Sequence, residues 1–150
     1  MRTAALPPVV AAVVALAVSG IRRLAPILLE SSVSIRPAER LTTYVMGGRF
    51  AAFVLIYGLL FGVALAVGTR DPGVSAASTA LATGASATVA FLVGSAAVLS
   101  YITPDQSVIV TAVFALGAAL GIGVQFAVVA YAGVSLGEGR RRDESKPAAA

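Results

Sequence analysis

Residues 108–136 read VIVTAVFALGAALGIGVQFAVVAYAGVSL and contain no charged side chain. A helix needs about 20 consecutive apolar residues to cross the hydrocarbon core of a bilayer, which is roughly 30 Å thick. The stretch is longer than this, and a helix would satisfy its backbone hydrogen bonds internally, as lipid requires. The sequence therefore predicts a transmembrane helix at this position.

The composition of the whole chain supports the same class of protein. Of its 150 residues 58% are hydrophobic and only 12% are charged, and the mean hydropathy is +0.92. Soluble globular domains carry about 25% charged residues. The charges gather in a few places and leave two further uncharged stretches long enough to span a bilayer, residues 50–68 and 74–102. We therefore expect an integral, multi-pass protein of the cell membrane.

A fourth apolar segment, residues 4–21, is shorter and has two interpretations. Pro7 and Pro8 fit a helix only in its first turn, which leaves a short apolar stretch beyond them. The alternative is a cleaved signal peptide, with Arg2 as its basic end and residues 17–19 as a small-residue cleavage site. The position of the prolines favours a retained helix. The expected fold is all-α, an antiparallel bundle of four transmembrane helices, or three if the first segment is cleaved.

The remaining segments connect or follow these spans. Residues 22–49 form the longest connector, which we expect to lie at the membrane interface. Residues 68–72, with the sequence GTRDP, predict a tight turn between two spans. Residues 137–150, GEGRRRDESKPAAA, are polar and predict a disordered tail. Residues 1–136 thus make a single transmembrane helical domain.

The positive-inside rule gives nearly equal support to the two orientations of the chain in the membrane. With four spans, six basic residues lie on one side and five on the other: Arg2, Arg70, Arg140, Arg141, Arg142 and Lys146 against Arg22, Arg23, Arg36, Arg40 and Arg49. The three consecutive arginines directly follow the last span, and they favour a cytoplasmic C-terminus.

Several chemistries lack the residues that they require. The chain has no cysteine and no histidine, which removes thiolate and imidazole ligands and the usual acid-base catalyst. All acidic residues fall in connectors or in the tail, where they do not serve an ion-coupled pathway inside the membrane. We expect no enzymatic activity, no cofactor, no bound metal and no nucleic acid partner.

Small residues indicate where the helices should touch. In lipid, burying a large apolar side chain between helices gains little, whereas close approach of two backbones gains more. Gly58 and Gly62 form a Gly-x-x-x-Gly step in the second span. In the last span Gly117, Gly121 and Gln125 recur every four residues and share one face. These five residues are the predicted helix-packing positions, and Gln125 is expected to bond across a helix interface.

Residues 74–90, VSAASTALATGASATVA, carry a second pattern. At 100° per residue the hydroxyls of Ser75, Thr79, Thr83 and Ser86 fall within an arc of about 80°. One interpretation of this hydroxyl stripe is a polar path for a small solute or ion. The other is that each hydroxyl bonds to a carbonyl one turn earlier, or across a helix contact, and carries no traffic. We favour the second interpretation.

Two functions of different class remain. The first is a structural or accessory membrane protein whose helices pack with one another or bind a partner. Its partners would be the lipid bilayer and a second copy of the chain or a larger membrane protein. The alternative is a small oligomeric pore or facilitator for a small solute or ion, with the hydroxyl stripe lining its path.

Overall fold

The computed structural model describes residues 3–22, 38–99 and 108–144, and within these ranges no residue lies in a strand. The prediction of an all-helical protein is confirmed. A short 3-10 turn, η1 (Thr3–Ala5), precedes α1 (Leu6–Arg22). The other helical elements are α3 (Ala38–Phe53), η2 (Val54–Leu60), α4 (Phe61–Arg70), α5 (Ala76–Leu99) and α6 (Val108–Glu144).

Three helices are long and apolar enough to cross a membrane: Met46–Arg70, Ala76–Val98 and Ile109–Glu144. They correspond to the three clear spans of the sequence. The first apolar segment is also helical, but its apolar part, Leu6–Gly20, is shorter. Parts of the predicted connector and of one span, residues 23–37 and 100–102, lie outside the described residues.

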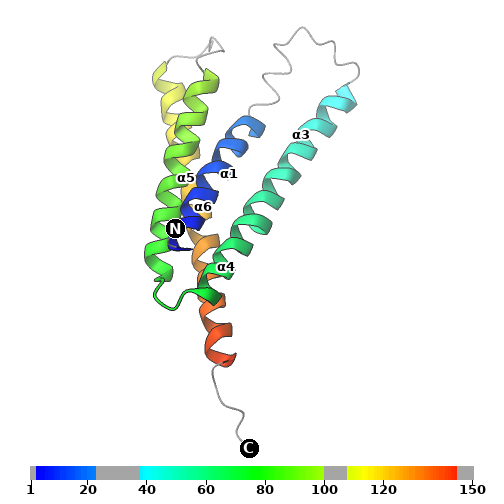
Figure 1. Ribbon diagram of the computed structural model, residues 1–150. Helices are drawn as coiled ribbons and strands as arrows, with labels where there is room; N and C mark the ends of the chain where they lie inside the picture. Colours follow the sequence, from blue (N-terminus) through cyan, green and yellow to red (C-terminus); the bar gives the residue numbers. More distant parts are fainter. Residues whose placement is uncertain (1–2, 23–37, 100–107, 145–150) are drawn as a thin grey trace, which may run out of the picture.

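The elements α3, η2 and α4 follow one another without a break and form one long helix (Figure 1). The middle element, η2, is a π-helix, and the backbone stays in the right-handed helical region at Phe53 and Phe61, on either side of it. Its wider turn changes the angular spacing of side chains between α3 and α4. The connector and the second span of the sequence are therefore joined in one helix from residue 38 onward.

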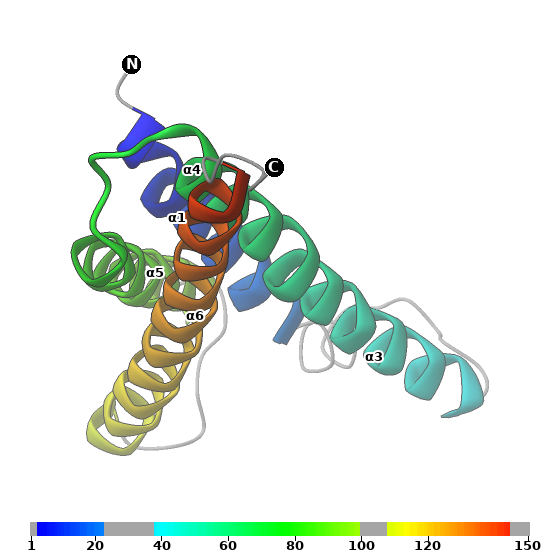
Figure 2. The ribbon, with the colours of Figure 1, turned by 90° about the horizontal axis from the view of Figure 1, so that it is seen from below.

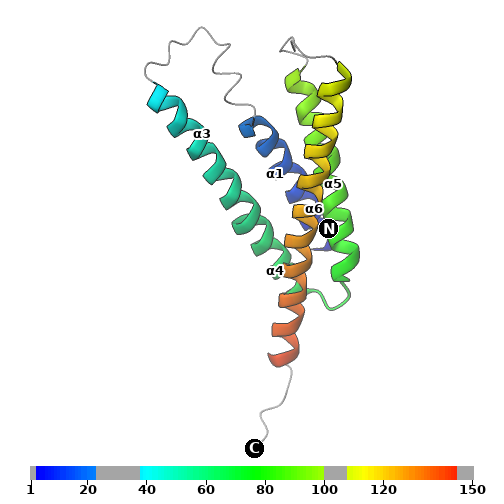
Figure 3. The ribbon, with the colours of Figure 1, turned by 180° about the vertical axis from the view of Figure 1, so that it is seen from behind.

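The core has two parts: the larger lies where α1, η2, α5 and α6 meet, and the smaller lies between α4 and α6. The largest fully buried side chains include Phe126 and Ile122 of α6, Leu60 of η2 and Val18 of α1. Figures 1 and 3 show α5 beside both α1 and α6, and α4 beside the last part of α6. By contrast, α3 leans away from the other helices (Figure 2), and none of its described side chains is buried.

A short turn separates α4 from α5. At Asp71 the backbone becomes extended, with φ −114° and ψ 106°. The N–H of Gly73 donates to Asp71 Oδ1 at 3.2 Å, which closes a local turn. Val74 is buried after the turn and anchors the start of the next helix. Gly68 lies within α4 and does not end it.

The predicted disordered tail is wrong for residues 137–144, which continue α6 to Glu144. The reason is contact with the end of α4, which the polar composition of the tail does not reveal. Gly137 is buried against that helix end, and Arg141 Nη1 donates to the carbonyl oxygen of Gly68 at 3.4 Å. A cation in the last turns of a helix also complements the helix dipole. Residues 145–150 lie outside the described residues.

Candidate functional site

Glycine allows the closest approach between α5 and α6. A Cβ atom added to Gly84 would lie 2.8 Å from the carbonyl oxygen of Gly123, and one added to Gly123 would lie 2.9 Å from the carbonyl oxygen of Gly84. Real Cβ atoms do not approach other atoms this closely. The two backbones are thus in direct contact, which is the kind of packing that stabilises helix pairs in lipid.

The crossing of α4 and α6 is built in the same way. A Cβ atom on Gly68 would meet the carbonyl oxygen of Val134 and lie 2.9 Å from its Cα atom. On the α6 side, a Cβ on Gly133 would lie 2.7 Å from Ala64 Cβ, and one on Gly137 would lie 2.8 Å from the backbone nitrogen of Thr69. The Gly-x-x-x-Gly spacing of Gly133 and Gly137 is the sequence signal that could have identified this crossing.

The glycines singled out from the sequence lie elsewhere. Among the described residues, a Cβ on Gly62, Gly117 or Gly121 would have no neighbour within 4 Å, and one on Gly58 would meet only Val54 Cγ1 of its own helix segment, at 3.8 Å. Their expected role in packing between helices of this chain is therefore not found. The reason is that these faces point outward, and sequence spacing identifies a face without identifying its neighbour. A role in contact with a second molecule stays a prediction.

Gln125 forms the bond across helices that the sequence led us to expect. Its Nε2 donates to Tyr57 Oη at 2.9 Å, and the bond joins α6 to the π-helical segment η2. The ring of Tyr57 lies against that of Phe53, with centroids 4.6 Å apart and planes inclined at 40°. Nothing in the sequence context of Tyr57 indicated a bond to Gln125.

The polar pair, Tyr57 and Gln125, lies far from the ends of two helices that are long and apolar enough to cross a membrane. Along the helix Tyr57 is about 12 Å from Arg49 and about 20 Å from Arg70, at a rise of about 1.5 Å per residue. Those arginines flank the uncharged part of the helix. The pair is only partly buried, since Tyr57 is 42% exposed. Polar groups at this depth are costly in lipid and often mark a functional contact.

The hydroxyl stripe is enclosed by helices at its centre. Thr79 and Thr83 are buried, whereas Ser86 is half-buried and Ser75 is exposed. The Thr83 hydroxyl oxygen has no hydrogen-bond partner among the described residues. Other hydroxyls bond back to their own helix, as Thr88 does to the carbonyl oxygen of Gly84 at 2.9 Å.

The described residues hold no group of three or more histidine, cysteine, aspartate or glutamate side chains that could bind a metal ion. The features of these residues with functional potential are the polar pair and the open faces around it.

A scan against models of protein families, a search of curated proteins and a search of solved structures each gave no match. The geometry of the chain itself is the basis for assigning a function.

Proposed function

We propose that the protein is a structural or accessory protein of the membrane, which binds a transmembrane helix of a larger membrane protein. The binding surface is the α6 docking face, defined as Gly117, Gly121 and Gln125. The observation that carries the proposal is that the polar pair, Tyr57 and Gln125, has hydrogen-bonding groups left without a partner among the described residues.

The hydrogen-bonding capacity of the polar pair supports a partner. Among the described residues, the contact between Gln125 and Tyr57 is the one hydrogen bond of either side chain. The tyrosine hydroxyl hydrogen and the glutamine carbonyl oxygen are then left to bond elsewhere. Hydrocarbon offers neither donor nor acceptor, and an unpaired polar group there costs free energy. A polar side chain on a partner helix at the same depth would satisfy both atoms.

The shape of the molecule around the pair supports the same proposal. Gly121 and Gly117 lie about one and two turns, respectively, from Gln125 on the same side of α6. Both are exposed, and α3 leans away from α6 (Figure 3). Glycines without neighbours permit a second backbone to approach closely. A partner helix would therefore pack against this face of α6.

The proposal includes a topology of four antiparallel spans, with α1 as the fourth. The inward face of α1, which includes Ala11, Val14 and Ala15, is buried in the same core as α5 and α6. A helix packed among three membrane helices shares their environment. The C-terminus, which follows Arg140, Arg141 and Arg142, is then placed in the cytoplasm.

A pore lined by the hydroxyl stripe is the weaker candidate. Thr83 is fully buried and Thr79 is 5% exposed, so a path along them would require the helices of one chain to separate. The burial of both threonines supports a role in packing.

The substitution Gly121→Leu tests the docking face. It adds a large side chain where this chain has open space, so it should leave thermal stability unchanged while it displaces a partner helix. We expect recovery of the partner with the tagged protein, measured by quantitative mass spectrometry in mild detergent, to fall at least tenfold.

The matched control is Ala85→Leu, which enlarges an exposed small residue on α5. It should leave partner recovery unchanged. Equal recovery with Gly121→Leu would place the partner elsewhere. Native mass spectrometry of the purified chain distinguishes the remaining case, because loss of a dimer would assign the docking face to a second copy.

A further inference from the structure

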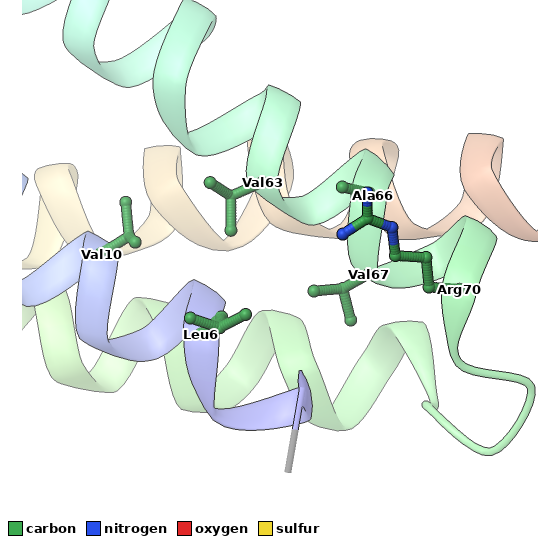
Figure 4. Close-up of a pocket in the computed structure, with 6 residues that line it drawn as sticks. All are labelled: Leu6, Val10, Val63, Ala66, Val67 and Arg70. Carbon is green, nitrogen blue, oxygen red and sulfur yellow. The ribbon is translucent and has the colours of Figure 1, made fainter. Parts of the chain in front are cut away.

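An apolar groove lies between the beginning of α1 and the end of α4. Its volume is about 220 Å³. An engineered cavity of about 150 Å³ in another protein admits benzene, so this groove has room for part of a hydrocarbon chain. Figure 4 shows the residues that line this α1–α4 groove: Leu6, Val10, Val63, Ala66, Val67 and Arg70.

The groove runs inward from the membrane surface. Arg70 is the last residue of α4, and the chain turns at the next residue. Arg49 and Arg70 are separated by about 31 Å along the helix, at about 1.5 Å per residue, which matches a hydrocarbon core of roughly 30 Å. Arg70 therefore lies at headgroup level, and Val63 lies about 10 Å deeper.

One end of the groove is cationic and the remainder is apolar. In Figure 4 the guanidinium group of Arg70 turns back along α4 towards Ala66, over the groove. Arg70 is exposed, so the group is accessible from the headgroup region. A guanidinium group presents several N–H donors in one plane and can bind two oxygens of a phosphate together. Leu6, which is 49% exposed, shows that the groove opens outward.

We propose that the α1–α4 groove binds an anionic phospholipid, with one acyl chain along the apolar lining and the phosphate at Arg70. An acyl chain gains little hydrophobic free energy by moving from lipid into the groove, since both surroundings are apolar. Selectivity must then come from the headgroup. A zwitterionic headgroup carries a cation that the guanidinium repels, whereas an anionic headgroup does not. This inference is independent of the partner helix.

The test uses the absence of tryptophan from the chain. A single tryptophan at Leu6→Trp reports on the groove, and one at Leu81→Trp reports on an α5 surface that is 73% exposed. The proteins are reconstituted in phosphatidylcholine vesicles containing brominated phosphatidylglycerol or brominated phosphatidylcholine, which quench tryptophan on contact. We expect about fivefold stronger relative binding of the anionic lipid at residue 6, the fold-change given by about 1 kcal/mol per arginine at a membrane surface. At residue 81 we expect almost no preference.

Charge variants identify the group responsible. Arg70→Gln, added to the Leu6→Trp protein, should reduce the preference for the anionic lipid at residue 6 to near unity. Arg70→Lys should keep part of this preference. Arg140→Gln removes an exposed charge from the same end of the molecule and should leave the preference unchanged. A preference that survives Arg70→Gln, or one that is equal at residues 6 and 81, would overturn the proposal.

A measurement on the unmodified chain tests the proposal even if a tryptophan variant misfolds. Phosphatidylglycerol added to the protein in detergent should raise its melting temperature, and Arg70→Gln should abolish this increase. No increase for the unmodified chain would also overturn the proposal. Stronger quenching at residue 6 by a brominated fatty acid would show that a free amphiphile occupies the groove in place of a phospholipid.

Discussion

A single methyl group separates glycine from alanine, and at Gly68 the structure has no space for it. The added Cβ would lie 2.9 Å from Val134 Cα. We expect Gly68→Ala to destabilise the protein by about 1–3 kcal/mol, the usual cost of overpacking. Thermal unfolding in detergent measures this change. Gly121→Ala is the matched control, because its Cβ would meet nothing, and it should leave stability unchanged or slightly higher.

The bond between Gln125 and Tyr57 gives a second prediction for single residues. Gln125→Leu should lower the free energy of unfolding by an amount on the order of 1 kcal/mol or less, as hydrogen bonds between membrane helices typically do. Tyr57→Phe removes the hydroxyl that accepts this hydrogen bond, and it should have a similar effect. If the two side chains act only on each other, the double variant should be no less stable than either single variant. Additive losses would indicate that each side chain has another partner.

The sequence supplied part of this site and not the rest. Gln125 could be identified because it is strongly polar in a long uncharged stretch, and its bond across helices followed from the cost of burying an amide in lipid. Tyr57 could not be identified as its partner, because the π-helical turn of η2 determines its direction. Glycine spacing marked the outward Gly117 and Gly121, although the closest contacts are made by glycines such as Gly84.

Among the elements, α6 differs most from expectation, because its last turns contact residues that are distant in the sequence. Gly137 is buried and Arg141 is half-buried, whereas Gly139, Arg140 and Asp143 are exposed. A polar, charged segment gives no local sign of this. The helical state of residues 137–144 depends on contact with the end of α4, which is distant in the sequence.

Cysteine substitution can test this helical extension, since the chain has no cysteine of its own. We expect a water-soluble maleimide to label cysteines at positions 139, 140 and 143 at least several times faster than one at position 141. The reason is that only residue 141 faces the end of α4. Uniform labelling at the four positions would indicate a disordered tail, as the sequence alone suggested.

At the scale of the whole molecule, the helices differ in length by more than a flat bilayer requires. At about 1.5 Å per residue α1 extends about 25 Å and α6 about 55 Å, against a hydrocarbon core of roughly 30 Å. Tilt and projection beyond the membrane accommodate such differences. The sequence predicted the number of long apolar segments, because lipid forces each into a helix. It could not predict that α3 would lean away, since an apolar surface is equally compatible with lipid and with protein.

The proposed topology makes a prediction about which ends of the helices share a side of the membrane. The turn between α4 and α5, which contains Gly73, and the last turns of α6, which contain Asp143, lie towards one end of the molecule (Figure 1). Tyr44 of α3 precedes Arg49 and lies towards the N-terminal end of the long helix, opposite to the end that leads into the turn. Cysteines at positions 73 and 143 should therefore behave alike, and one at position 44 should behave oppositely.

Labelling of intact cells with a membrane-impermeant maleimide measures this pattern and also the orientation. With the C-terminus in the cytoplasm, position 44 should react in intact cells, whereas positions 73 and 143 should react only after lysis. The reverse pattern would keep the topology and invert its orientation, which is the outcome that the nearly balanced arginines leave open. Different behaviour of positions 73 and 143 would contradict the topology itself, because α5 and α6 together return the chain to the side from which α5 starts.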